Sequence, residues 1–212
     1  MRVYRKLLPA ENQLFRDHLL RLSPDDRVSR FAGSVSDSRI IEYVSRFDWL
    51  TAVVIGYFVD GALRGVAELR WLDPGTGWRA ELAVTVEEAW QDGRIGTELL
   101  RRAIGYARNR GLKSLAMICL TENRRMQAIA RKFAGDLVFE GSQVEAAITL
   151  PFPTQFTLLA EALGDSVAFA TSWWDQISHG LGDPAKTPTL AAGATQGGGL
   201  AILTPGKSLR FC

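Results

Sequence analysis

Before residue 153, apolar positions follow two periods that alternate along the chain. Alternating or continuous apolar runs predict strands, and apolar residues three or four positions apart predict helices. Strands are expected at 3–8, 79–86, 112–121, 137–141 and 144–150, and helices at 11–22, 36–47, 95–109 and 122–133. One more helix is expected to begin after Ser23, an N-cap residue that is followed by proline.

Two apolar, β-branched runs between residues 50 and 72 meet at Asp60-Gly61. This dipeptide favours a type I′ turn, which needs positive φ at both central positions, so the runs are expected to form an antiparallel hairpin. A strand, a turn, a helix and another strand follow the hairpin. Together these elements predict an α/β (α+β) fold with a mixed, mostly antiparallel central sheet and helices on both faces.

The pattern changes after Pro153. Apolar residues between 156 and 177 keep helical spacing, which predicts a C-terminal helical arm that packs on its own domain or, as a homodimer contact, on a second copy. From Gly180 onward glycine, alanine, threonine and proline dominate, which is typical of a flexible tail. We therefore expect a domain at 1–152, an arm at 153–179 and a tail at 180–212.

Composition limits the classes of partner. A chain of 212 residues with 47% hydrophobic content suits one domain with a real core. Its 25 basic and 23 acidic residues leave a formal net charge of +2, which gives little electrostatic reason to expect nucleic acid. Local arginine clusters after residue 100 fit either a phosphorylated small molecule or solvated helix faces.

No stretch has the length and apolar character of a signal peptide or a membrane span, so we expect a cytoplasmic protein with no membrane partner. The two cysteines, Cys119 and Cys212, imply no disulfide framework. His18 and His179 stand apart from other metal-ligating side chains, so no metal site is expected.

The turn "QDGRIGT" joins the strand at 79–86 to the helix at 95–109. A helix N-terminus collects free backbone N–H groups and the positive end of the helix dipole, which favours an anion. Gly93 and Gly96 would let a phosphate approach the backbone, and Thr97 could add a hydroxyl. An ordinary strand-to-helix connection would also use two glycines, so both interpretations remain open at this point.

The order Gln91-Asp92-Gly93-Arg94-Ile95-Gly96 resembles the Q/R-x-x-G-x-G/A signature of the GNAT acyl-CoA-dependent N-acetyltransferase superfamily. The stretches "LSPDDRVSRFAG", "AELAVTVEEAWQ" and "LTENRRMQAIARK" look like the acetyltransferase domain of bacterial Pat-type protein lysine acetyltransferases. The resemblance covers about residues 2 to 150 and implies a GNAT-like fold.

One departure from the signature concerns charge. Arg94 stands where the family has its first motif glycine, and Asp92 stands where relatives have a small residue. A carboxylate beside a diphosphate is unfavourable, and Arg94 would offset it or grip phosphate itself. This departure is therefore expected to change the affinity for the coenzyme.

The resemblance implies acetyl-CoA as co-substrate. Its pantetheine arm is expected to add to the open edge of the strand at 79–86 like an extra strand, with the N–H of Val84 or a neighbour facing the thioester oxygen. The positions that the helix terminus and the resemblance together assign to the coenzyme are Val84, Thr85, Val86, Gln91, Asp92, Gly93, Arg94, Ile95, Gly96, Thr97 and Asn123. Asn123 is expected either to contact the pantetheine or to cap the next helix. Arg131 and Lys132 are expected either to reach the adenosine phosphate or to remain exposed on their helix.

The expected catalytic base is Glu81, which matches a glutamate that Pat-type relatives use to deprotonate the amine. The alternative is a glutamate in solvent or paired with Arg70 or Arg79. Glu68 on the preceding strand is the reserve candidate. A tyrosine acid is not expected, because the position seven residues after Asn123 is an alanine.

The sequence therefore predicts an enzyme that transfers an acetyl or short acyl group from coenzyme A to a primary amine by direct attack. The acceptor is a protein lysine or a small-molecule amine. The alternative from another class is a non-catalytic sensor that binds acyl-CoA and reports through the arm at 156–177. Acyl-CoA and an amine acceptor are the expected partners.

Overall fold

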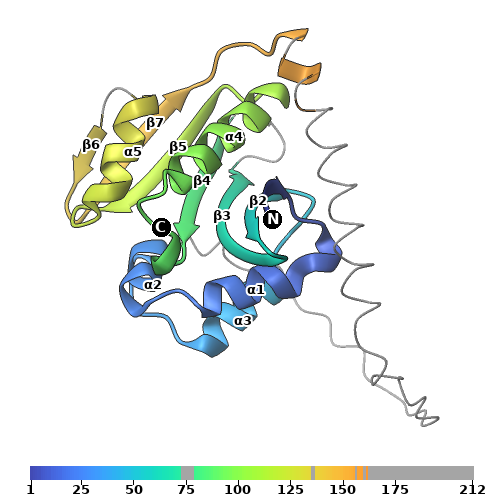
Figure 1. Cartoon of the computed structure of the whole chain (residues 1–212). Coiled ribbons are helices and arrows are strands. Elements are labelled where there is room, and N and C mark those ends of the chain that lie inside the picture. Colours follow the sequence, from blue (N-terminus) through green and yellow to red (C-terminus); the bar gives the residue numbers. More distant parts are fainter. Residues whose placement is uncertain (73–78, 135–136, 156, 160, 162–212) are drawn as a thin grey trace, which may run out of the picture.

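In the computed structural model, the described residues are 1–72, 79–134, 137–155, 157–159 and 161. They form one seven-stranded sheet with the order β1-β2-β3-β4-β5-β7-β6 (Figure 1). The strands are β1 Arg2–Lys6, β2 Ala52–Val59, β3 Ala62–Trp71, β4 Arg79–Val86, β5 Ser114–Leu120, β6 Leu137–Glu140 and β7 Gln143–Thr149. Among these described strands β4 and β5 pair in parallel and the other neighbours are antiparallel.

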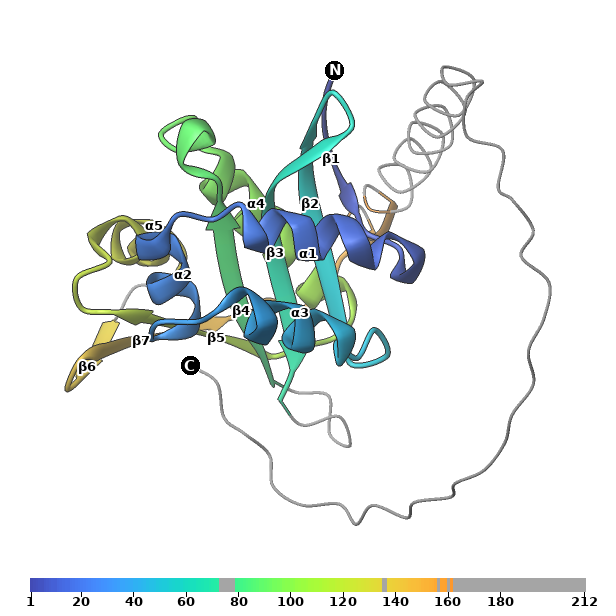
Figure 2. The same ribbon diagram turned by 90° about the horizontal axis from the view of Figure 1, so that it is seen from below.

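Helices cover both faces of this sheet (Figures 1 and 2). One face carries α4 Ile95–Asn109, which packs on β2 to β4, and α5 Arg124–Ala134, which packs on β5 and β7. The other face carries α1 Asn12–Leu20, α2 Pro24–Phe31 and α3 Asp37–Ser45, with α1 on β3 and α2 across β4 and β5. The mixed, mostly antiparallel sheet with helices on both faces is thus confirmed.

Each sheet face has its own apolar core, because successive strand residues point to opposite faces. Leu69 of β3 and Leu82 of β4 pack with Leu99 and Leu100 of α4. On the opposite face, Phe15 and Leu19 of α1 pack with Ile40 of α3, Val54 of β2 and Val66 of β3. Strand β3 therefore contributes to both cores, whereas the buried apolar residues of β4 in these two clusters belong to the core under α4.

The feature that matters for function is the divergence of β4 from β5. The two strands pair at Arg79 with Ser114, Ala80 with Leu115 and Glu81 with Ala116. Beyond Glu81 no pairing between them is found in the described sheet, although both strands continue. Residues 82–86 of β4 therefore keep β3 on one side and present an open edge on the other.

Local signals in the sequence located most elements. Asp60 and Gly61 have φ of 49° and 78°, which confirms the hairpin turn, and Ser23 caps α2 by accepting a bond from the Asp26 N–H. The bounds of β4 and α4 agree with the prediction.

The first strand was predicted too long, since it ends at Lys6 and a 3-10 helix, Pro9–Glu11, follows. A second 3-10 helix, Glu88–Trp90, was not predicted. The Glu11 carboxylate explains the first of these, because it binds Arg5 and the Leu8 N–H and so turns the chain after β1.

The predicted arm at 153–179 lies largely outside the described residues, as does the tail at 180–212. Its described part contacts this domain, since Asn109 at the end of α4 donates to the Thr157 carbonyl and to Glu161. Glu161 also pairs with Lys6 and Arg110. The first turn of the arm therefore packs on its own domain. None of the described helices is long and apolar enough to cross a membrane.

Candidate active site

A cleft of about 340 Å³ occupies the gap between the diverging strands. Residues 82–86 of β4 and 117–119 of β5 form its walls, and α2, α4, α5 and the loop before α4 complete it. Helix α2 lies on one face of the sheet, and α4 and α5 lie on the other (Figures 1 and 2). Because residues of all three helices line the cleft, it extends through the sheet between β4 and β5. Its volume suits a small molecule or cofactor.

The loop at 91–97 places the start of α4 in this cleft. Helix geometry leaves the N–H groups of Ile95, Gly96 and Thr97 without partners inside the helix, and Arg94 supplies no side-chain cap. All four residues line the cleft. The cleft therefore contains a helix N-terminus whose free N–H groups and dipole favour an anion.

The two glycines of this loop do not have positive φ angles, but two of its other residues do. Asp92 and Arg94 have φ of 66° and 58°, whereas neither glycine is in the left-handed region. A Cβ atom at Gly93 would lie 3.5 Å from the Ile95 side chain, which is ordinary contact. At Gly96 it would lie 3.4 Å from the Ile129 side chain, so packing within the protein requires neither glycine.

Arg94→Gly is expected to stabilise the fold, since a left-handed backbone costs a residue with a Cβ about 1 kcal/mol and costs glycine almost nothing. Equilibrium urea unfolding would measure the gain. Arg94→Ala is the matched control, because it removes the guanidinium and keeps the Cβ. Equal gains in both variants would show that the side-chain charge, and not the backbone, is the source.

Gln91 of the signature and Asn123 each have a structural role at the cleft. Gln91 donates through Nε2 to the Val86 carbonyl at 3.0 Å and to the Asp26 carboxylate at 3.1 Å, so it ties β4 to α2. Asn123 accepts from the Met126 N–H at 3.0 Å, which confirms the expected helix cap, and it also lines the cleft.

The partner of Asp92 differs from the expectation. Arg125 at the start of α5, and not Arg94, reaches Asp92, with Nη2 at 3.4 Å from Oδ1. Arg125 also donates to Oε1 of Gln91. Both Asp92 and Arg125 line the cleft, and their side chains join the loop to α5 across its mouth.

Glu81 lies at the vertex where the strands separate. It directly precedes the lining segment and is not itself a lining residue. Arg79 pairs with Glu145 and Arg70 with Glu68, so among the described residues the Glu81 carboxylate has neither a hydrogen bond nor an ion pair. Partial burial raises the pKa of Glu81, and the negative charge of the neighbouring Glu68 raises it further. The positive charges of Arg30 and Arg70 lower it, but the net shift is upward.

Glu68, the reserve candidate, is poorly suited to accept a proton. Its buried carboxylate binds Arg30 at 2.7 Å, the Tyr43 hydroxyl at 2.5 Å and Arg70 at 3.0 Å. Burial raises the pKa of Glu68, but Arg30, Arg70 and Tyr43 outweigh burial and lower it. Glu68 is therefore a fixed anion that orients Arg30 at the cleft wall.

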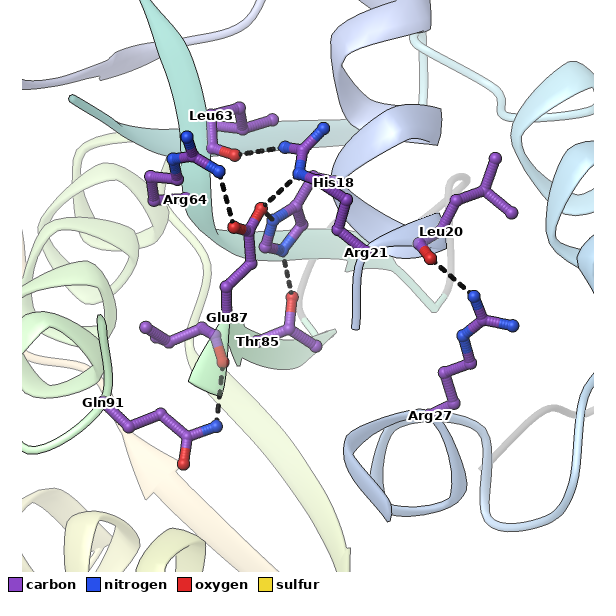
Figure 3. Close-up of polar contacts among 10 residues, drawn as sticks. His18, Leu20, Arg21, Arg27, Leu63, Arg64, Thr85, Glu87 and Gln91 are labelled. Carbon is purple, nitrogen blue, oxygen red and sulfur yellow. Dashed lines mark hydrogen bonds and ion pairs between the residues drawn. The ribbon is translucent and has the colours of Figure 1, made fainter. Parts of the chain in front are cut away.

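A second buried network lies behind the open edge of β4 (Figure 3). Glu87, which follows β4, accepts bonds from Arg21 at 2.8 Å and from Arg64 at 2.9 Å. Its carboxylate also lies 3.2 Å from Nδ1 of the fully buried His18, whose Nε2 lies 2.9 Å from the Thr85 hydroxyl.

Glu87 is ionised, so Nδ1 carries the ring proton and Nε2 accepts from the Thr85 hydroxyl. Although burial opposes ionisation, the bonds from His18, Arg64 and Arg21 lower the pKa of Glu87 to about 2. Burial in turn lowers the pKa of His18. The network anchors the strand end where β5 no longer supports it.

The structure brings most of the predicted coenzyme positions together. The cleft is lined by Val84, Thr85, Val86, Gln91, Asp92, Arg94, Ile95, Gly96, Thr97 and Asn123. Gly93 is not among the lining residues, and neither are Arg131 and Lys132, which are exposed near the end of α5.

Sequence reasoning missed Arg30, and it noted Arg125 only as one member of a local arginine cluster, without assigning it to the coenzyme. Both fall within stretches that carry the family resemblance, but their spacing alone carries no signal. No group of three or more histidine, cysteine, aspartate or glutamate side chains that could hold a metal occurs in the part of the chain that the structure describes.

Comparison with known proteins agrees with this geometry. The acetyltransferase (GNAT) family matches residues 20–135. The GNAT domain of PAT from S. lividans has a TM-score of 0.59 and 18% identity, over 69% of this chain and 89% of that one. A GNAT-family acetyltransferase of Streptococcus pneumoniae has a TM-score of 0.56 and 14% identity, over 71% and 100%.

The yncA protein of Salmonella typhimurium, solved with its cofactor acetyl-CoA, has a TM-score of 0.51 and 15% identity over 73% of this chain and 96% of that one. At such identities these similarities establish the fold, while the family match spans more than half of the chain. The chain therefore belongs to the GNAT family of N-acetyltransferases.

Proposed function

We propose that this protein binds acetyl-CoA in the cleft between β4 and β5 and transfers the acetyl group to a primary amine, with Glu81 as general base. The observation that carries the proposal is the open edge of β4 with the uncapped N-terminus of α4 at its end. The open strand edge suits an extended arm with amide groups, and the helix N-terminus suits a diphosphate, so one cleft fits both parts of such a ligand.

The two halves of the ligand would meet different walls. The diphosphate would bind the N–H groups of Ile95, Gly96 and Thr97, close to Arg94 and Arg125. The pantetheine arm would pair with residues 82–86, whose backbone has no partner on that side among the described strands. A free N–H near Val84 would stabilise the oxyanion that forms on the thioester carbonyl.

The acceptor amine brings a proton that must leave. An amine of pKa about 10.4 is only about 0.04% neutral at pH 7, a handicap of about 4.6 kcal/mol. Glu81 is half-buried, free of hydrogen bonds within the described residues and close to the vertex, and its pKa is raised. It is therefore the carboxylate best placed to take this proton.

The acceptor would enter from the face of α2. The coenzyme mouth is formed by α4 and α5, whereas Asp26, Ser29 and Arg30 of α2 line the opposite side of the cleft. Entry from opposite faces brings amine and thioester together at the vertex without either blocking the other. The sequence resemblance to Pat-type protein lysine acetyltransferases favours a protein lysine as acceptor, and a small-molecule amine fits the same opening.

Release of free coenzyme A from acetyl-CoA tests this proposal directly. A panel of lysine peptides and small amines should include acceptors that raise thiol release well above hydrolysis, with acetylated product visible by mass spectrometry. Tight acetyl-CoA binding with no acceptor-dependent release across the panel would instead support a non-catalytic acyl-CoA sensor.

A further inference from the structure

The ion pair between Asp92 and Arg125 has a position that folding alone does not explain. Their side chains are 80% and 66% exposed, and an exposed pair contributes little to stability. Yet both residues line the cleft, and the pair connects α5 to the loop that begins the anion site. The contact spans the entrance that a diphosphate would use.

The other hydrogen bond of Arg125 is also made to this loop. Its Nη1 donates to Oε1 of Gln91, whose Nε2 is already committed to Val86 and Asp26. Each described polar contact of Arg125 is thus made to the loop at 91–92. The guanidinium is held at the cleft mouth by acceptors that a phosphate group could replace.

Charge decides which acceptor is preferred. A diphosphate offers more negative charge than one carboxylate and accepts parallel N–H bonds from a guanidinium. Asp92, by contrast, would lie beside the bound diphosphate with the same sign of charge. The carboxylate therefore opposes binding twice, since it repels the phosphate and occupies the arginine that would bind it.

We propose that Arg125 is a diphosphate-binding residue that Asp92 holds in the free protein, and that the guanidinium transfers from carboxylate to phosphate when the coenzyme binds. This inference rests on the proposed function. It makes the Asp92–Arg125 pair an internal competitor that sets the affinity for coenzyme A.

A double-mutant cycle on coenzyme A binding, measured by calorimetry at low salt, tests the transfer. Asp92→Asn suits the backbone, because asparagine tolerates positive φ as well as aspartate does. We expect Asp92→Asn to bind coenzyme A about tenfold more tightly and Arg125→Gln about tenfold more weakly, with the gain from Asp92→Asn falling below about threefold in the Arg125→Gln background.

Asp25→Asn and Arg124→Gln are the matched controls, since each removes the same charge from an exposed position that does not line the cleft. Both should leave the dissociation constant within about twofold. An equal gain from Asp92→Asn in both backgrounds, or no gain at all, would overturn the transfer while leaving coenzyme binding intact. Absence of binding in every well-folded variant would overturn the proposed function as well.

Discussion

Glu81→Gln should lower kcat by about 100-fold, because the variant keeps the shape of the vertex and loses the group that takes the amine proton. The dissociation constant for coenzyme A should change little, since Glu81 precedes the segment that lines the cleft. Steady-state kinetics with a responsive amine and calorimetry with coenzyme A measure the two effects. Glu145→Gln removes a nearby carboxylate of β7 outside the cleft lining and should keep normal turnover.

The pH dependence of the rate gives a second test of Glu81. Only the ionised carboxylate can accept a proton, so activity should rise with pH through the pKa of Glu81, which burial holds above the ordinary glutamate range. This acidic limb should be missing from the residual activity of Glu81→Gln. An unchanged limb, or unchanged turnover, would remove Glu81 from the mechanism.

Glu87→Gln should destabilise the fold by about 3 kcal/mol at neutral pH. The reason is that the pKa of Glu87 is about 2 in the folded protein and near 4.5 in the unfolded chain, and this difference measures how strongly the fold stabilises the ionised carboxylate. The loss removes the anion that joins His18, Arg21 and Arg64 behind β4. Urea unfolding at pH 7 measures it. Glu88→Gln, which changes the exposed neighbouring residue, should be nearly neutral.

The sign of the pH effect follows from the lowered pKa of Glu87. A carboxyl group with a depressed native pKa stabilises the fold above its unfolded pKa, and this contribution is lost as the pH falls through the native value. The stability gap between the native chain and Glu87→Gln should therefore close between about pH 4.5 and pH 2. A gap that stays constant over this range would show that Glu87 acts by packing and not by charge.

Short-range patterns in the sequence predicted part of this fold. The alternation of "RAELAVTV", the helical spacing from Ile95 and the turn at Asp60-Gly61 each depend on residues a few positions apart, and these elements agree with the structure. The signature loop could be placed at the start of α4 for the same reason. The residues assigned to the coenzyme therefore meet in one cleft, with Gly93 as the exception.

Side-chain partners brought together by the sheet could not be read in this way. Arg125 and Asp92 lie 33 positions apart, and His18 and Glu87 lie 69 apart, so no local spacing links them. The commitment of Glu68 to Arg30 and Tyr43 likewise depends on the packing of α2 and α3 against β3. These contacts distinguish Glu81 from Glu68, a choice that residue type alone leaves open.

A crystal structure of the protein with acetyl-CoA tests the central claim most directly. The account predicts the diphosphate on the N–H groups of Ile95, Gly96 and Thr97, with the pantetheine arm hydrogen-bonded along residues 82–86 and the thioester near the vertex at Glu81. Coenzyme bound outside this cleft, or a cleft that stays empty at saturating concentration, would contradict it.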